Sequence, residues 1–76
     1  MNRKQQKAVQ DAIQELESAK ENYPKNFNSL HEGYAVLKEE VDELWDEIKM
    51  KNPDELKVYT EAKQVVAMGL RIMSEF

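Results

Sequence analysis

The apolar positions of the chain fall into three runs with helical spacing. The first run advances by three and four residues in alternation, through Val9, Ala12, Leu16, Ala19 and Tyr23, and Pro24 follows it directly. Steps of three and four place side chains on one face of an α-helix, and proline disrupts a helix interior. The pattern therefore predicts an amphipathic helix that ends before Pro24.

The second run is the most regular. It consists of Leu30, Tyr34, Leu37, Val41, Leu44 and Ile48, at steps of 4-3-4-3-4 residues. This heptad spacing is typical of a helix that packs along other helices. Ser29 and Glu32 have the spacing of a capping box at its start, and Asn52 followed by Pro53 predicts the N-cap and first residue of a third helix.

The third predicted helix has an unusually wide apolar face. One line contains Val58, Ala62, Val65, Gly69, Ile72 and Phe76, and a second line beside it contains Tyr59, Val66 and Met73. Such a face is too wide for one neighbour, so we expect this helix to lie centrally or at an interface. Glycine costs about 1 kcal/mol relative to alanine inside a helix, so Gly69 is expected to permit close approach of another helix.

These runs predict an all-α fold, with residues 1–76 forming a single three-helix domain. A chain of this length buries only about 60% of its unfolded surface, which leaves little stability. With no cysteine, disulfides are excluded as the supplement. We therefore expect homo-oligomerisation into a helical bundle, as a homodimer or a dimer of dimers.

Charge and hydropathy narrow the choice of partners. The net charge is -4 and charged residues make up 34% of the chain. This balance argues against a direct nucleic-acid partner, which normally requires a basic surface. No segment has the length and apolarity of a membrane span or a signal-peptide core, so we expect no membrane association and a cytoplasmic location.

Six carboxylates and no cation occur in the nine residues from Glu39 to Glu47. On a helix, Glu40, Glu43 and Glu47 flank the heptad line, whereas Glu39, Asp42 and Asp46 lie on the far side. Carboxylates beside a packed face repel one another and lose solvent, and a divalent cation would compensate them. The alternative is a solvated acidic face without a ligand.

The spacing of Glu40 and Glu43 is repeated by Glu61 and Gln64 in the third predicted helix. Side chains one helical turn apart can reach the same ion, and Mg²⁺ prefers oxygen ligands. Antiparallel packing of the two helices would bring the four side chains together, so they are the predicted metal ligands.

The segment Leu37-Lys38-Glu39-Glu40-Val41-Asp42-Glu43-Leu44 resembles the Glu-Glu-x-x-Glu-Leu signature of the MazG-like all-α nucleoside triphosphate pyrophosphohydrolases. Glu61-Ala62-Lys63-Gln64 is similar to their second motif, Glu-x-x-Asp, with glutamine in place of aspartate. The run from Ser29 to Leu37 is similar to short phage- or prophage-type members, and the resemblance extends over residues 27 to 76.

The resemblance implies Mg²⁺, or alternatively Mn²⁺, bound at Glu40, Glu43 and Glu61, with the amide oxygen of Gln64 at the fourth position. It also implies paired subunits and cleavage of a nucleoside triphosphate to monophosphate and pyrophosphate, in nucleotide-pool control. Either Glu39 or Glu43 would orient or deprotonate the attacking water.

Two other functions remain open. One is a non-enzymatic helical oligomerisation module with a decayed site, favoured by Gln64 and by the few residues that follow the second motif. The other is an acidic protein that occupies a nucleic-acid-binding partner. Trp45 would either stack on a nucleobase or anchor an interface. Lys63 and Arg71 would contact either phosphates or the acidic helix.

Overall fold

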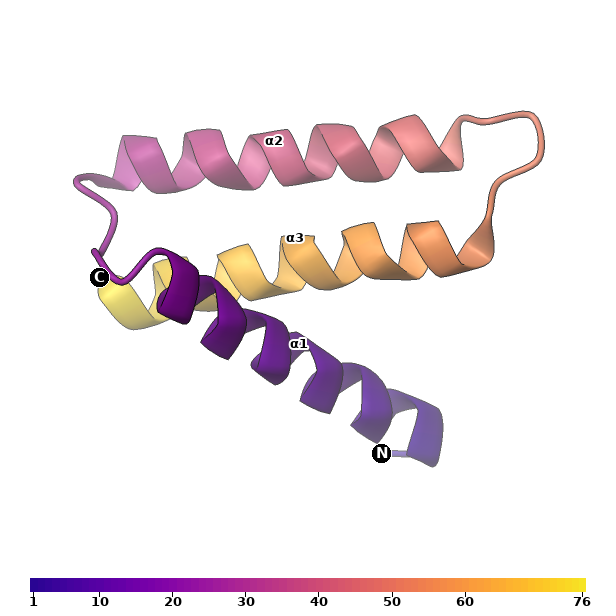
Figure 1. Cartoon of the computed structure of the whole chain (residues 1–76), viewed down its shortest axis with the longest axis horizontal. Coiled ribbons are helices and arrows are strands. Elements are labelled where there is room, and N and C mark those ends of the chain that lie inside the picture. Colours follow the sequence, from indigo (N-terminus) through magenta and orange to yellow (C-terminus); the bar gives the residue numbers. More distant parts are fainter.

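The computed structural model describes all residues from Met1 to Phe76 and contains three helices and no strand. Helix α1 spans Arg3–Asn22, α2 spans Leu30–Ile48 and α3 spans Glu55–Glu75. Helices α2 and α3 form an antiparallel pair, and α1 crosses α3 diagonally (Figure 1). The predicted all-α class with three helices is confirmed. None of the helices combines the length and the apolarity that a membrane span needs.

Side-chain caps fix where each helix begins. Asn2 and Gln5 form a complete capping box before α1, with both backbone–side-chain hydrogen bonds at 2.9 Å. At α2, Ser29 Oγ accepts from the amide of Glu32 as predicted. The other half of the predicted box is wrong, because the Glu32 carboxylate accepts from the backbone of Asn28 instead of that of Ser29.

The predicted start of α3 is also wrong. Its N-cap is Asp54, two residues after Asn52, and the helix begins at Glu55. One carboxylate oxygen of Asp54 accepts from the amides of Leu56 and Lys57, which would otherwise lack partners in the first turn.

Helix α3 lies between the other two helices in the packing order. Both α1 and α2 pack on α3, and no close backbone contact joins α1 to α2. The expected central position of the third helix is therefore confirmed. The second apolar line, Tyr59, Val66 and Met73, stays exposed within the chain, however, and so does Phe76 at the end of the first line.

The hydrophobic core is small. Ala12, Phe27, Ala67 and Met68 are its only buried apolar residues. Phe27, Ala67 and Met68 form one cluster, and partly buried side chains from all three helices pack against it, namely Leu16, Ala19, Val36, Leu37 and Ile72. No large side chain is completely buried, which fits the limited core expected for so short a chain.

Within the chain, the close approach of two helices occurs at Gly33, and the approach predicted at Gly69 is not made by a helix of the same chain. A Cβ atom placed on Gly33 would lie 3.2 Å from side-chain carbons of both Ile72 and Phe27. A Cβ placed on Gly69 would meet nothing within 4 Å. Within one chain, therefore, Gly33 is the glycine at which an added Cβ would crowd its neighbours.

A buried ionic network joins the α1–α2 loop to the end of α3. The Arg71 side chain is only 6% exposed; its Nε donates to Glu75 at 2.9 Å and its Nη2 donates to the carbonyl of Lys25 at 3.2 Å. The guanidinium carbon also lies 4.0 Å from the centre of the Phe27 ring. Arg71 thus pairs within its own helix, and its expected pairing with the acidic helix is wrong.

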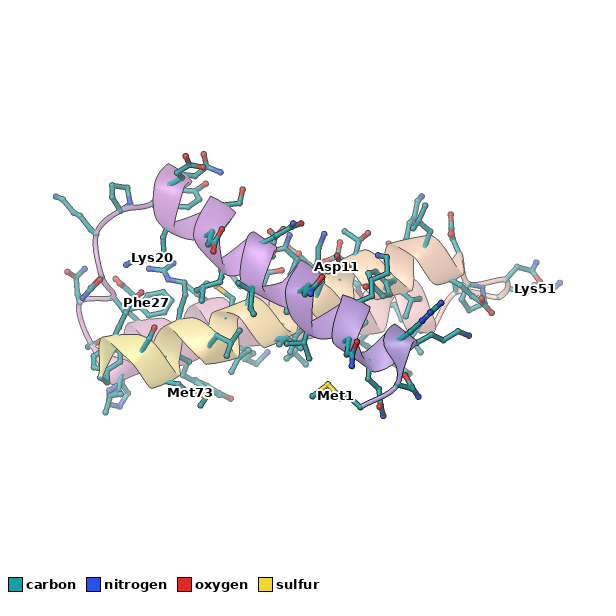
Figure 2. The ribbon with its side chains drawn as sticks, turned by 90° about the horizontal axis from the view of Figure 1, so that it is seen from below. Met1, Asp11, Lys20, Phe27, Lys51 and Met73 are labelled. Atoms are coloured by element: carbon teal, nitrogen blue, oxygen red, sulfur yellow. The ribbon has the colours of Figure 1, made fainter.

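Glu75 accepts the remaining hydrogen bonds of this network. It accepts from the Phe27 amide at 2.7 Å and from Lys20 Nζ at 3.1 Å. Burial alone would raise the pKa of Glu75, but hydrogen bonds from Arg71, Phe27 and Lys20 lower it to about 2. Figure 2 shows Lys20 and Phe27 close together at this end of the bundle.

Candidate metal centre

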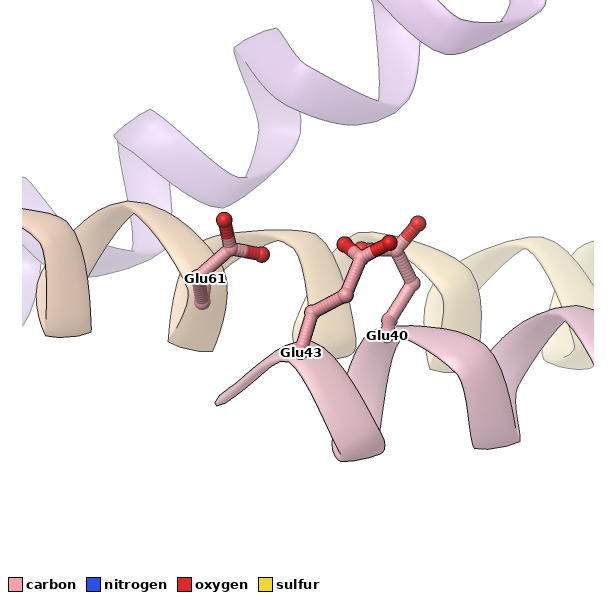
Figure 3. A group of neighbouring side chains, drawn as sticks. All are labelled: Glu40, Glu43 and Glu61. Atoms are coloured by element: carbon pink, nitrogen blue, oxygen red, sulfur yellow. The ribbon is translucent and has the colours of Figure 1, made fainter. Parts of the chain in front are cut away.

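The structure brings three of the four predicted ligand side chains into one cluster. Each of Glu40, Glu43 and Glu61 offers a carboxylate oxygen that lies within 4.8 Å of the other two. Glu40 and Glu43 project from α2 toward α3, where Glu61 faces them (Figure 3). This separation is short enough for one cation to contact all three oxygens. We refer to these three residues as the acidic cluster.

Local helix geometry explains the meeting of these side chains. Residues three apart in a helix lie on one face, so Glu40 and Glu43 share the side of α2 that faces Glu61 of α3. Glu61 is half-buried on the side of α3 that packs toward α2. Because the two helices are antiparallel, their middles are adjacent, and the motifs of both helices lie near these middles.

The cluster is electrostatically unfavourable without a counter-charge. Burial, together with repulsion from Glu43, Glu61 and Glu39, raises the pKa of Glu40 to about 7. Burial and the charges of Glu43 and Glu47 also raise the pKa of Glu61. None of the chain's ion pairs involves Glu40, Glu43 or Glu61. The fold therefore concentrates negative charge here without supplying a cation of its own.

One atom of the cluster is buried and has no partner. Glu61 Oε2 is shielded from solvent and makes no hydrogen bond. A buried carboxylate oxygen without a donor costs free energy, which a bound cation or a proton would recover. Together with the hard oxygen ligands, this orphaned atom makes the cluster a chemical fit for a divalent ion such as Mg²⁺.

Gln64, the fourth predicted ligand, is engaged elsewhere through its amide nitrogen. Gln64 Nε2 donates to Glu15 Oε1 at 2.5 Å. The other oxygen of Glu15 lies 3.8 Å from Lys63 Nζ, so Lys63 pairs with α1 and not with the expected acidic helix. Gln64 thus links the Glu61 side of α3 to α1, and its role as a metal ligand stays a prediction.

A groove with a volume of about 540 Å³, lined by both polar and apolar side chains, adjoins the cluster. Glu39 and Glu40 of α2, Gln64 of α3 and Glu15 of α1 all contribute to its wall. The end of α1 and the α1–α2 loop also line the groove, through residues that include Asn22, Lys25, Asn26 and Asn28. Glu39, a predicted catalytic residue, is exposed on this wall. Glu43, the other candidate, belongs to the cluster itself.

Glu15 is the residue of this region that sequence reasoning missed. A signal was present, because Glu15 directly precedes Leu16 of the first apolar run, just as Glu40 precedes Val41 of the second. A carboxylate at the edge of an apolar stripe is carried toward the helix–helix contact. Which helix it meets depends on how α1 crosses α3.

Trp45 lies away from the acidic cluster. It is two residues beyond Glu43, and two residues correspond to a rotation of about 200° around a helix. Trp45 is 57% exposed on the opposite side of α2. This position favours Trp45 as an anchor of an interface over Trp45 as a stacking platform for a nucleobase at the cluster.

The comparisons with known proteins give no relative. Neither protein-family models, curated sequences nor solved structures contain a match to this chain. The MazG-like resemblance therefore stays a hypothesis that rests on the quoted motifs.

Proposed function

We propose that the chain is a Mg²⁺-dependent nucleoside triphosphate pyrophosphohydrolase that acts as a homodimer or a dimer of dimers. The observation that carries the proposal is the acidic cluster, in which Glu40, Glu43 and Glu61 converge from two helices around the unpartnered Glu61 Oε2. The resemblance of both motifs to the MazG-like enzymes supports the same assignment. Mn²⁺ is the alternative ion.

Glu40, Glu43 and Glu61 would hold the metal, and Gln64 would add an uncharged oxygen. The ion would neutralise the cluster and polarise the substrate phosphates. The groove beside Glu40 offers space for the remainder of the nucleotide, with asparagine amides and Lys25 at its far end. These groups can hydrogen-bond a base or sugar without adding more negative charge.

The reaction requires a positioned water. Water attacks the α-phosphorus, the bond from that phosphorus to the bridging oxygen breaks, and pyrophosphate leaves. Glu39 or Glu43 accepts the proton that the water loses. Glu39 has the better access to the groove, because it lies on the groove wall and is exposed.

The test is a direct assay with canonical and modified nucleoside triphosphates in the presence of Mg²⁺ or Mn²⁺. Monophosphate and pyrophosphate are expected in equal amounts, and Glu40→Gln is expected to abolish both. Asp42→Asn is the matched control, because Asp42 is exposed and pairs with Lys38 outside the cluster. Product that persists in Glu40→Gln would contradict the proposed site.

Absence of product with every nucleotide, combined with no thermal stabilisation by either metal, would favour the second candidate. That candidate is a helical assembly module without catalysis. It is favoured by the Gln64–Glu15 hydrogen bond, which engages the amide of the altered motif position.

A further inference from the structure

Several apolar side chains remain exposed along the α2–α3 pair and form a strip at heptad spacing. The strip contains Tyr34, Val41 and Ile48 on α2, Val66 and Met73 on α3, and Phe76 at the C-terminal end of α3, and all six are between 44% and 79% exposed. We call these six residues the apolar seam. Exposed apolar patches of this extent on a small chain usually mark a contact surface.

The seam lies on the face of the helix pair opposite the acidic cluster. On α2, the seam residues and Glu43 lie on opposite sides of the contact with α3, and Glu40 is half-buried within that contact. On α3, Gln64 hydrogen-bonds Glu15 of α1, whereas Met73 points away from α1 (Figure 2). Val66 lies at the α1 edge of the seam, where it lines an apolar pocket with Val9 and Ala12 of α1. Since the two helices are antiparallel, their exposed apolar lines fall on the same face.

The exposed area is larger than a free chain of this mass normally has. The accessible surface is 6005 Å² for a mass of 8.9 kDa. Folded monomers of that mass expose about 4,800 Å². The excess of about 1,200 Å² is what one subunit of an obligate homodimer contributes, since such interfaces bury a total of about 2,000 Å² or more.

The spacing of the seam indicates a helical occupant. Tyr34, Val41 and Ile48 recur every seven residues, as do Val66 and Met73. This repeat is the pattern of a surface that packs along helices of matching repeat. Gly69 lies between Val66 and Met73 with open space above it, so a helix from outside the chain can approach closely there.

We propose that the apolar seam is the surface on which a second copy of this chain packs, with the acidic clusters of both copies on the outer sides of the assembly. The second copy supplies two helices with the same repeat and the same excess area. The interface is a four-helix bundle in which two α2–α3 pairs pack face to face. Each cluster is then complete within one chain and does not border the interface.

The first test is the mass in solution, measured by sedimentation equilibrium with the 8.9 kDa chain as the unit. The full-length protein is expected to have twice that mass or a higher multiple. Tyr34→Arg and Met73→Arg, at sites 62% and 79% exposed in the single chain, are expected to lower the association constant at least tenfold. Gln14→Arg on the exposed side of α1 is the control and should keep the wild-type mass.

The second test uses Gly69→Arg, followed by circular dichroism and thermal unfolding over a range of protein concentrations. A side chain at Gly69 meets nothing in the single chain. Both a folded monomer and an unfolded chain would therefore support the seam as an interface, provided that Gln14→Arg remains folded and associated. A monomeric wild-type protein whose melting temperature is independent of concentration would overturn the proposal. So would an oligomer that persists in all three seam variants.

Discussion

Glu40 and Glu75 show how the same side chain acquires opposite properties in one small protein. Both are glutamates at the edge of a helix contact, but Glu75 receives hydrogen bonds from Arg71, Lys20 and the Phe27 amide, whereas Glu40 faces other carboxylates. The pKa of Glu75 is consequently lowered to about 2, while that of Glu40 is raised to about 7. A buried carboxylate that accepts hydrogen bonds from cations and amides stabilises the fold, whereas one that faces other carboxylates is stabilised by a bound cation or a proton.

Replacing Glu40 with glutamine removes one charge from the cluster at nearly constant volume. In metal-free buffer at pH 8, we expect Glu40→Gln to raise the free energy of unfolding by about 1 kcal/mol, after discounting the pKa shift for solvent screening. The same change should abolish the rise in melting temperature that Mg²⁺ gives to the wild type. Urea unfolding and a Mg²⁺ titration of thermal stability measure the two effects. Equal stabilisation by Asp42→Asn would show that net charge, and not the cluster, is responsible.

We expect protonation of Glu75 to contribute to unfolding of the chain in acid. Its pKa is lower in the folded chain than its ordinary value of 4.5, so its contribution is complete above pH 4.5 and is lost as the pH falls toward 2. Glu75→Gln should cost about 3 kcal/mol at pH 7 and flatten the dependence between pH 4.5 and 2. Urea unfolding at a series of pH values measures this. An unchanged slope in the variant would mean that other carboxylates govern acid unfolding.

At the scale of helices, the order and number of elements follow from the apolar spacing, whereas their ends and contacts depend on individual side chains. The heptad line from Leu30 to Ile48 coincides with α2, and α1 ends before Pro24 as predicted. Asn52-Pro53 carried a helix-start signal, but Asp54 has the side chain that accepts from two backbone amides. Local sequence contains both signals and does not rank them.

The contacts of Gly33 could not be predicted because they depend on residues distant in sequence. Phe27 comes from the α1–α2 loop and Ile72 from α3, and they meet over Gly33 only in the assembled fold. Glu15 was missed for the same reason, since the crossing of α1 decides that it meets Gln64. In contrast, the Glu40, Glu43 and Glu61 set was predictable, because each motif occupies one helix and only antiparallel pairing was needed.

The N-cap of α3 can be tested with a matched pair of substitutions. Asp54→Ala removes the acceptor for the amides of Leu56 and Lys57 and should cost about 1 kcal/mol of stability. Asn52→Ala is the control and should have little effect, because Asn52 caps nothing. Chemical denaturation of both variants decides between the two positions, and a larger loss at Asn52 would contradict the cap assignment.

At the scale of the whole molecule, the two faces of the α2–α3 pair have different chemistry. One face carries the acidic cluster and the groove, and the other carries the apolar seam, whose Val66 borders the N-terminal half of α1. A chain with only four buried apolar residues gains stability from covering the second face, and its charged face stays open to solutes. Association and metal binding are therefore expected to be separate properties.

This separation predicts a reciprocal result from one pair of variants. Met73→Arg should weaken association but keep the Mg²⁺-dependent rise in melting temperature, because Met73 is remote from Glu40, Glu43 and Glu61. Glu40→Gln should keep the wild-type mass and lose the response to Mg²⁺. Sedimentation and thermal unfolding of both proteins, each with and without Mg²⁺, measure the four quantities. If Met73→Arg lost the metal response while it remained folded, the cluster would depend on the second copy, and the two faces would have to be coupled through α3.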